Sequence, residues 1–543
     1  MEAGRLDNGR AMKFPRLAAL FGFSILMVGL TRLPFFPAHL YSFDSVNLAL
    51  ALEHFDPTLH QPQPPGYPLF VLEARLLNLL FGSAEQTFAA LGLLVSGLAV
   101  GMLYLVGKEL FSPWAGMVAA ALLFVNPPFW FSSLSSPLRP HLALVSAAVA
   151  YFCWRAKRGE REPLYAASLA LGVGGGTRPE LYLLLLPLWI WAAWQTRDRK
   201  AIVRGALLLA VSGLVWAAVL VVASGGPQRL LAYFTDYALV QTEYTSVVLD
   251  PSTSWRRAVG RAVIWTGLGA LPWIWTLPFA WKARGSTPDW VRKAVFLGLW
   301  FVPGWAFFLV VHIGDPDHTL GIVPPLCLLG GFSLVEAERR ITRAWIPQLE
   351  ERGLLVWLAL VGNLVLFFGE MPLPQRDAAA EFRGLTSLSD AALIGTYETS
   401  YARVRWVEQM ADLNLKGINE LKASTDRPVL LLWTWDGEPS WRKIGFYLPK
   451  DNLYVLEERG TPGVAAAAAR FYAGTRLVTR YTGPPPFRLS VPKGARLIWV
   501  AGAGTVESLR KVLPLQSFST LQYADLPADS PSIQWGSFEL VPE

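Results

Sequence analysis

The sequence is poor in charge and in cysteine. Only 16% of its 543 residues are charged, whereas 53% are hydrophobic and 23 are tryptophan. A soluble domain of this size does not need so much apolar and aromatic surface, so the composition predicts a membrane protein that crosses the bilayer several times. The two cysteines, Cys153 and Cys327, both lie within apolar runs. They exclude a disulfide framework and a cysteine-based metal site.

Other absences concern targeting and repeats. Basic residues precede the first apolar run, but no small-residue cleavage site follows it, so we expect an uncleaved anchor rather than a signal peptide. We find no internal repeat of fixed period and no low-complexity tract. The net charge of +7 would suggest nucleic acid as a partner of a soluble protein. Here the basic residues lie in loops between apolar runs, so they report on topology and no nucleic-acid partner is expected.

Apolar runs of about 20 residues, long enough to cross a bilayer, recur along the first two thirds of the chain. The stretch 163–195 is apolar on both sides of Thr177-Arg178-Pro179-Glu180. An Arg-Pro-Glu step within lipid is costly, so we predict two helices that meet at this break and about eleven spans in total. The other runs lie near 17–36, 87–107, 113–131, 140–154, 202–223, 259–281, 293–312, 319–335 and 353–370.

Residues 66–82 are apolar but carry Glu73, Arg75 and Asn78. If this piece lies in the membrane interface, all the basic loops fall on one side of the membrane. If it crosses, that bias breaks after the first span. We therefore predict an interfacial helix within an outer loop over 37–86, and a cytoplasmic N-terminus. The expected location is a bacterial inner or cell membrane.

From about residue 372 the composition becomes that of a soluble domain. Strand-like and helix-like runs alternate there, which predicts a small α/β extracytoplasmic domain over 372–543, after a transmembrane domain over 1–371. The expected fold class is thus mostly α and polytopic, with an added α/β unit. The strand-like runs are 429–435, 453–456, 476–481, 497–501 and, more weakly, 538–541; the helix-like runs are 400–423, 462–474 and 505–513.

Asp44 opens an amphipathic run within the outer loop. One interpretation is a helix N-cap, a position that aspartate suits well. The other is a general base at the lip of a membrane cavity, which takes a proton from an acceptor hydroxyl as a leaving group departs. Glu53 and Asp56 are weaker candidates, because loop carboxylates are usually only solvated.

The long loop after the first span, the early Asp44 and the element Gln63-Pro64-Pro65-Gly66-Tyr67 resemble the GT-C glycosyltransferases. The nearest group is the protein O-mannosyltransferase-like family 39, and the resemblance covers roughly residues 15–370. It implies a GT-C-like fold with juxtamembrane helices, and transfer of a sugar from a polyprenyl phosphate to an acceptor on the outer face. It also implies that Asp44 is the catalytic base and that the Gln63–Tyr67 element binds the donor phosphate.

The sequence departs from the family at two positions. Ser45 follows Asp44 where the family commonly has Asp-Glu, and Gln63 stands where many members have Lys or His. An amide donates a hydrogen bond but brings no positive charge. His60 or another loop must then supply the cation; the candidates are Arg139, His141, Arg178 and His318.

Arg178 follows three glycines and precedes Pro179-Glu180. It could mark a helix end and pair with Glu180, or it could clamp a phosphate with its planar guanidinium. Arg139 could likewise bind an anion or be an interfacial anchor.

The loop from His312 to His318 contains two histidines and two aspartates. It reads as a tight turn, because Gly and Pro dominate it. The set would also allow a divalent cation, but its spacing matches no established ligand pattern, so we assign no metal ligands and no certain cofactor. We expect His318 to bind the phosphate or the sugar ring.

Aromatic and small residues mark three further segments. The loop 225–258, with its tyrosines, could stack on sugars but is more typical of interfacial anchoring. The cluster 433–443 suits carbohydrate contact or packing onto the membrane domain. The turn 501–505 joins a strand to a helix, as phosphate-binding turns do, but lacks their further glycines and lysine.

The sequence thus predicts a membrane glycosyltransferase that moves a single hexose or pentose from a polyprenyl-phosphate donor to a hydroxyl of a protein, lipid or glycan, with inversion. Two alternatives are a membrane carrier or flippase for a lipid-linked sugar, and a scaffold of the same fold that has lost activity. The expected base is Asp44. The expected donor-phosphate contacts are His60, Gln63, Tyr67, Arg139, Arg178 and His318, and the expected acceptor or sugar contacts are Glu53, Glu180 and Asp315.

Overall fold

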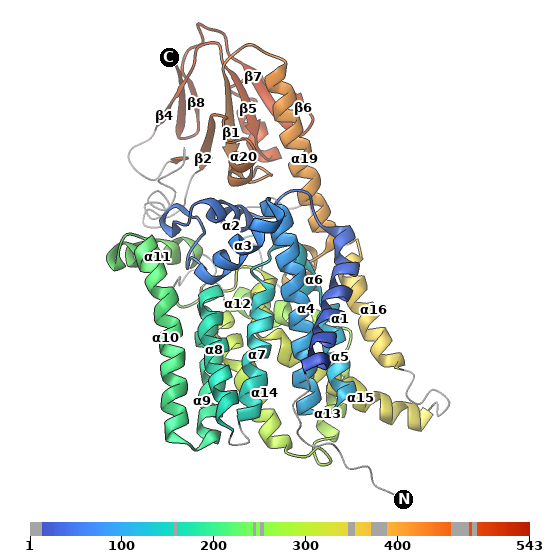
Figure 1. Cartoon of the computed structure of the whole chain (residues 1–543). Helices are drawn as coiled ribbons and strands as arrows, with labels where there is room; N and C mark the ends of the chain where they lie inside the picture. Colours follow the sequence, from blue (N-terminus) through green and yellow to red (C-terminus); the bar gives the residue numbers. More distant parts are fainter. Residues whose placement is uncertain are drawn as a thin grey trace, which may run out of the picture.

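The computed structural model describes residues 14–156, 160–242, 246–249, 255–345, 353–370, 388–457, 477–479 and 486–543. A helical part comprises the described elements as far as Glu398. A C-terminal domain, which begins with the long helix at Tyr401 and carries the described strands, stands on one end of it (Figure 1). The predicted boundary at 371/372 adjoins residues 371–387, which lie outside the described residues.

The helical part is built from helices that mostly run from one end of it to the other. Short 3-10 turns, η1 to η5, connect some of them. The helices are α1 (Phe14–Arg32), α2 (Phe43–Glu53), α3 (Pro68–Phe81), α4 (Ala84–Leu110), α5 (Pro113–Phe124), α6 (Pro127–Ser135), α7 (Pro140–Ala156), α8 (Arg161–Thr177), α9 (Glu180–Thr196), α10 (Arg199–Ala223), α11 (Pro227–Thr242), α12 (Trp255–Gly267), α13 (Leu277–Lys282), α14 (Trp290–Val310), α15 (Val323–Trp345), α16 (Leu354–Phe368) and α18 (Leu388–Glu398); the turns are η1 (Leu33–Phe35), η2 (Pro57–Leu59), η3 (Leu268–Ala270), η4 (Ile274–Thr276) and η5 (Pro316–Gly321).

Within the part of the chain that the structure describes, four helices, α1, α4, α10 and α14, are each long and apolar enough to cross a membrane. Two bent pairs pass the same test together: α5 with α6, bent by 54°, and 258–270 with 274–282, bent by 82°. Proline explains both bends, because it lacks the N–H that would continue a helix: Pro127 opens α6, and Pro272 lies in the second break. The chain is therefore an integral membrane protein with several passes, and the number eleven stays a prediction.

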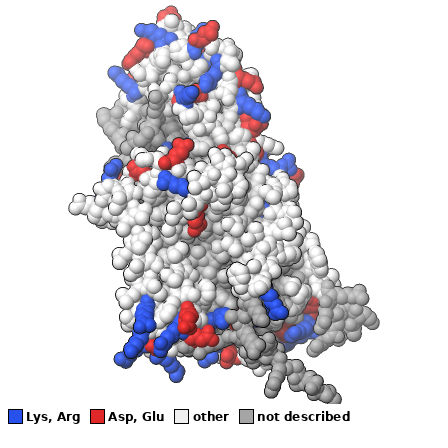
Figure 2. All heavy atoms as spheres, viewed as in Figure 1, with Lys and Arg blue, Asp and Glu red and all other residues white. Residues whose placement is uncertain are grey.

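The surface agrees with this assignment. Figure 2 shows few charged side chains on the belt around the middle of the helical part, and more Lys, Arg, Asp and Glu toward its two ends. Leu214 and Val222 of α10, for example, expose 69% and 79% of their surface, as side chains that face lipid do.

The segment 66–82 forms helix α3, which lies with α2 at the end of the helical part that faces the C-terminal domain (Figure 1). Its side chains Leu72, Leu76, Leu79 and Leu80 are all exposed. An exposed apolar stripe at helical spacing is typical of a helix in the membrane interface, and the interfacial placement of 66–82 stays a prediction.

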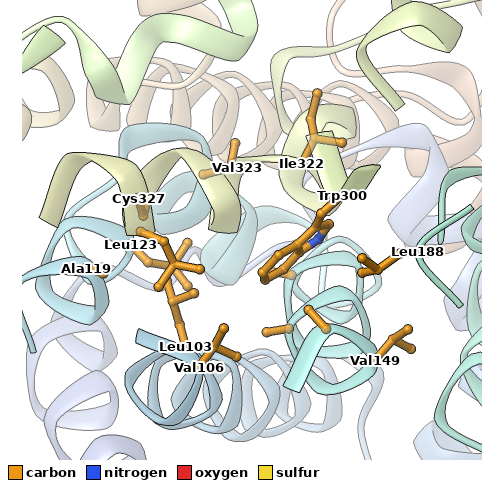
Figure 3. Close-up of a cluster of buried hydrophobic side chains, with 14 of the residues drawn as sticks. Leu103, Val106, Ala119, Leu123, Val149, Leu188, Trp300, Ile322, Val323 and Cys327 are labelled. Carbon is orange, nitrogen blue, oxygen red and sulfur yellow. The ribbon is translucent and has the colours of Figure 1, made fainter. Parts of the chain in front are cut away.

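A large buried cluster of aliphatic and aromatic side chains fills the middle of the helical part. Figure 3 shows Trp300 of α14 pointing into it, beside Leu188 of α9, with Val149 of α7 nearby. Glycines allow the helices to approach closely there: a side chain at Gly107 of α4 would meet the α5 backbone at Gly116, 2.5 Å away. The helices that carry the polar residues are thus held by a closely packed scaffold.

The C-terminal domain has two sheets. The larger has the strand order β3-β2-β1-β5-β7-β6, parallel from β3 to β5 and antiparallel beyond; the smaller has the order β4-β9-β8. The elements are α19 (Tyr401–Ala423), β1 (Val429–Thr434), α20 (Trp441–Tyr447), β2 (Leu453–Glu457), β3 (Leu477–Thr479), β4 (Phe487–Val491), β5 (Arg496–Val500), α22 (Ala503–Leu509), β6 (Gln516–Phe518), β7 (Leu521–Asp525), β8 (Ile533–Trp535) and β9 (Phe538–Pro542).

The prediction of an α/β unit is confirmed, with differences in detail. The sequence missed β4, β6, β7 and β8, which are short and mix polar with apolar residues. The helix predicted at 505–513 begins and ends earlier, as α22, and the one at 462–474 lies outside the described residues. The predicted loop 225–258 contains the helix α11 and the first residues of α12.

Helix α20 packs on the loop between α1 and α3. Trp441 contacts Phe43, with ring centroids 5.3 Å apart, and Lys443 donates a hydrogen bond to the carbonyl of Tyr41. Of the two uses suggested for the cluster 433–443, packing onto the helical part is therefore the one that the structure shows.

Candidate functional site

A polar cavity of about 290 Å³ opens at the end of the helical part that faces the C-terminal domain. Its walls come from α2, the loop 54–67, the helix ends around Arg139 and Arg178, α11, α14 and the loop 311–318. The lining residues are Phe43, Asp44, His60, Gln63, Pro65, Tyr67, Arg139, Arg178, Glu180, Tyr237, Gln241, Phe307, Phe308, His312, Gly314, Asp315 and His318.

Asp44 lies in the first turn of α2 and is not its N-cap. Ser42 is the N-cap, and it forms a reciprocal capping box with Ser45. The interpretation of Asp44 as a cap is therefore wrong, and its carboxylate is left to face the cavity. Ser45, where the resembling family has Glu, instead serves to begin the helix.

The surroundings of Asp44 raise the pKa of its carboxyl above the usual value, mainly through desolvation. Although 44% of the side chain remains accessible within the cavity, protein surrounds the rest. Arg139, Arg178 and a hydrogen bond from the Gln63 side chain oppose this shift. The Gln63 amide thus hydrogen-bonds to the expected base, a contact different from the phosphate contact that the resemblance implies.

The loop that carries Gln63 is tightly folded. His60, Gly66 and Tyr67 all have positive φ, at 57°, 96° and 43°. At Gly66 a side chain would meet Leu220 of α10 at 2.4 Å, so only glycine lets the loop lie against that helix. The Tyr67 hydroxyl donates to the Pro64 carbonyl, which closes the loop on itself.

Arg139 lies among three carboxylates. Its guanidinium is 3.9 Å from Asp44, 3.7 Å from Asp315 and 3.6 Å from Asp317. Asp317 is buried, and this desolvation raises the pKa of its carboxyl to about 6. Since every one of these contacts is longer than a hydrogen bond, Arg139 keeps donors that a bound anion could use.

Arg178 caps the break between α8 and α9, where the sequence predicted two helices to meet. It pairs with Glu180, as one of the two interpretations expected, and its guanidinium lies over the Tyr67 ring at 5.3 Å. Both members of the pair line the cavity. The two interpretations of Arg178 are thus compatible, because a guanidinium has five N–H donors and Glu180 occupies only part of them.

Two histidines of the cavity, His312 and His318, are not its cations. Desolvation lowers the pKa of His312 to about 4 and that of His318 well below its usual value, and Arg139 adds to both shifts. His318 Nε2 lies 3.5 Å from an oxygen of Asp315. His60 Nδ1 is 3.0 Å from the Tyr233 hydroxyl. We therefore assign the positive charge of the cavity to Arg139 and Arg178, and hydrogen bonding to the neutral His312 and His318.

Two residues that the sequence singled out lie elsewhere. Glu53 is exposed at the end of α2 and does not line the cavity, so its assignment as an acceptor or sugar contact is wrong as far as this cavity is concerned. His141 is buried against Glu73 of α3, at 3.0 Å, and against the Pro137 carbonyl. It joins the interfacial helix to α7.

The cavity also contains residues that the sequence either did not assign or offered only as one of two interpretations. Tyr237, for which stacking on a sugar was the second interpretation, and Gln241 come from α11, and the neighbouring Tyr233 is buried. Phe307 and Phe308 end α14. A helical spacing of Tyr233, Tyr237 and Gln241 was the one signal that could have found the α11 face.

Asp315, Asp317 and His318 could hold a metal ion, since one ligand atom from each lies within 4.8 Å of the others. Carboxylate and imidazole ligands suit several divalent ions. Arg139 already supplies positive charge beside two of these groups. A metal there would compete with Arg139 for the same oxygens.

Three comparisons bear on this geometry. The family model of dolichyl-phosphate-mannose-protein mannosyltransferase matches residues 62–223. The chain is 28% identical over 315 residues to undecaprenyl phosphate-alpha-4-amino-4-deoxy-L-arabinose arabinosyl transferase 1 of Pseudomonas fluorescens, a match that covers 54% of each chain. The chain thus spans about half the length of the curated relative that it matches.

The fold is similar to that of ArnT from Cupriavidus metallidurans, solved bound to undecaprenyl phosphate and in the apo state. In both cases the TM-score is 0.56, the identity 16%, and the match covers 94% of this chain and 98% of that one. The predicted GT-C-like fold and the resemblance to polyprenyl-phosphate-sugar glycosyltransferases are confirmed.

Proposed function

We propose that this protein is a membrane glycosyltransferase that moves one sugar from an undecaprenyl-phosphate-linked donor to an acceptor hydroxyl, with inversion at the anomeric carbon. The comparisons support the general class, a membrane glycosyltransferase that uses a lipid-linked sugar. The observation that carries the proposal is the meeting of one carboxylate, Asp44, with two guanidiniums in one cavity beside the membrane interface.

In the proposed reaction an oxygen of Asp44 takes the proton of the acceptor hydroxyl. The acceptor oxygen attacks the anomeric carbon from the side opposite the phosphate, and the bond between that carbon and the phosphate oxygen breaks. The raised pKa of Asp44 makes it a stronger base than an exposed aspartate, once it is deprotonated.

Negative charge develops on the departing polyprenyl phosphate. Arg139 and Arg178 would stabilise it, with His60 and His318 as hydrogen-bond partners and Tyr67 at the side of Arg178. The partly enclosed cavity strengthens each of these contacts, because there is less water to screen them. Glu180 and Asp315 would contact the sugar or the acceptor.

A divalent cation at Asp315, Asp317 and His318 would add positive charge beside the leaving phosphate. Its contribution is tested by transfer assays in the presence of a chelator, followed by re-addition of Mg²⁺ or Mn²⁺. Activity that falls with the chelator and returns with the metal assigns the cation a role, and unchanged activity assigns the charge to the arginines alone.

We also propose that the N-terminus is cytoplasmic and that the cavity and C-terminal domain are extracytoplasmic. Lys108, Arg199 and Lys282, at helix ends far from the cavity, support this orientation through the positive-inside rule. Labelling of single cysteines introduced in the C-terminal domain with a membrane-impermeant reagent, in intact cells, tests it.

The test of function is the substitution Asp44→Asn in purified protein, assayed for release of undecaprenyl phosphate from a sugar-linked donor. We expect transfer to fall about 10³-fold or more while binding of undecaprenyl phosphate persists. A variant that keeps substantial transfer removes Asp44 from the mechanism. A wild-type protein that binds the donor without consuming it would indicate a carrier instead.

A further inference from the structure

We propose that Arg442, in the C-terminal domain, is a positioning residue for the transfer reaction. It ties together the two ends of the segment that brings Asp44 and His60 to the cavity. This inference rests on the proposed function and extends it: the C-terminal domain would be a working part of the catalytic site rather than only a separate module above it.

Arg442 lies in the first turn of α20 and reaches out of its own domain. Its Nε donates a hydrogen bond of 3.0 Å to the side-chain oxygen of Asn47. Its Nη2 donates to the backbone carbonyls of Leu59, at 3.0 Å, and His60, at 3.4 Å. One guanidinium therefore joins helix α2 to the far end of the loop that follows it.

The two places that Arg442 holds are next to cavity residues. Asn47 is completely buried and lies one helical turn after Asp44 in α2. His60 lines the cavity and has left-handed backbone, at φ 57°, a conformation that is uncommon for residues other than glycine. A shift of either end of this segment would move the expected base relative to its partners.

The neighbours of Arg442 contact the same segment. The Trp441 ring meets the edge of Phe43, and Phe43 in turn lies against the His60 ring, with centroids 5.3 Å and 6.4 Å apart. Phe43 and His60 both line the cavity. The contact between the two parts of the molecule is thus continuous with the wall of the cavity.

The planar guanidinium of Arg442 donates hydrogen bonds to α2 and to the loop after it at the same time, through Nε and Nη2. A lysine ammonium is a point donor on a flexible stem and cannot reproduce this bridge. Without Arg442, the buried Asn47 oxygen and two carbonyls lose charged donors, and the segment gains room to move. Displacement of a catalytic group by about 1 Å can cost about 100-fold in rate.

The test compares Arg442→Ala with Arg427→Ala in full-length purified protein. Arg427 makes a matched pair of guanidinium–carbonyl hydrogen bonds, to Gly494 and Leu526, within the C-terminal domain itself. We expect kcat for transfer to fall about 10- to 100-fold in Arg442→Ala, with a smaller change in KM for the donor, and to stay unchanged in Arg427→Ala. Millimolar guanidinium should restore part of the loss in Arg442→Ala.

A role confined to holding the fold gives a different result: both variants lower the melting temperature, the folded enzyme keeps its kcat, and guanidinium restores nothing. That result overturns the proposal. If Arg442→Ala does not give monodisperse protein, Arg442→Lys is assayed against the same control, and wild-type kcat in that variant overturns it equally. Absence of transfer by the wild-type protein is separate, since it contradicts the proposed function itself.

Discussion

Two arginines, one in each part of the molecule, are used in opposite ways. Arg496 of the C-terminal domain holds Asp525 with two hydrogen bonds of 2.6 Å and 2.8 Å, and Ser424 and the Leu421 carbonyl accept two more. Arg139 of the helical part has three carboxylates at 3.6 Å to 3.9 Å. Arg496 donates hydrogen bonds within the protein from all three of its nitrogens. The three carboxylates around Arg139 lie beyond hydrogen-bond distance.

This difference shows how structural and functional roles are divided between the two parts of the molecule. A saturated guanidinium stabilises the fold and has few donors left for a ligand. A guanidinium with long contacts contributes less to stability but can rearrange around a bound phosphate. In the cavity or beside it, Asp317 Oδ1 and Gln63 Oε1 are likewise buried without a hydrogen bond, so they too can pair with a bound ligand.

The largest expected effect is that of Arg139→Gln. It removes the positive charge that faces three carboxylates, so transfer should fall about 10³-fold, as when an electrostatic donor to a developing anion is lost. The free energy of unfolding should fall as well, because the buried Asp317 loses its charged partner, so the rate is compared per folded molecule. Transfer assays and thermal unfolding of the same preparation check both parts.

An Arg139→Gln variant that unfolds but keeps the wild-type rate in its folded fraction would contradict the assignment of Arg139 to catalysis. His318→Gln is the control for charge, because it keeps a hydrogen-bonding side chain at the cavity. A smaller loss than in Arg139→Gln is expected there, because a neutral group replaces a neutral group.

The next effect is on stability. Arg496→Gln removes two charged hydrogen bonds to Asp525 and two more to α19 and its C-cap, so the C-terminal domain should lose about 2 kcal/mol or more in its free energy of unfolding. Transfer per folded molecule should be unaltered. Chemical denaturation followed by tryptophan fluorescence, with transfer assayed in parallel, measures the two quantities. A large loss of transfer in the folded variant would contradict the assignment of Arg496 to stability alone.

Local signals explain how much of the site could be predicted from the sequence. Asp44 after a long loop, the Gln63–Tyr67 turn and the polar break at Arg178 each stand out from an apolar background, and all three face the cavity. The helix over 66–82 is present as α3, and its interfacial placement stays a prediction from charge parity. These features could be predicted because their causes, bilayer thickness and the cost of charge in lipid, act along the chain.

Features that depend on distant contacts could not be predicted. Asp317 is buried against Arg139, 178 residues earlier in the chain, and nothing near Asp317 distinguishes it from an exposed turn residue. The bridge from Arg442 to Asn47 spans 395 residues. The short strands β6 and β8 are formed by pairing with β7 and β9, not by their own propensity.

The dependence of stability on pH should differ in sign between two carboxyls. The folded-state pKa of Asp317 is raised to about 6, so this group binds protons more strongly in the folded protein, and its contribution to stability decreases as pH rises from about 4 to 6. Asp525 has a lowered pKa because of its hydrogen bonds to Arg496. Its contribution is present at neutral pH and is lost as pH falls below the usual range of aspartate.

Melting temperatures at pH 7 and pH 5 measure the contribution of Asp317, because the contribution of Asp525 changes only at lower pH. Asp317→Asn should remove the part of the stabilisation at pH 5 that comes from protonation of Asp317, whereas Asp525→Asn should lower stability at both pH values. Equal pH dependence in wild type and Asp317→Asn contradicts the assignment of a raised pKa to this group.

The smallest expected effect separates two glutamates of the helical part. Glu180 pairs with Arg178 inside the cavity. Glu53 is the exposed last residue of α2 and does not line the cavity. Glu53→Gln should leave kcat and KM within twofold of wild type, since an exposed side chain contributes little to either. Glu180→Gln should raise KM for the donor, because Arg178 would lose the charged partner that holds its guanidinium in place in the cavity. Because both changes remove one negative charge from the same end of the molecule, an equal effect of the two would mean that overall charge near the membrane, rather than the geometry of the cavity, governs donor binding.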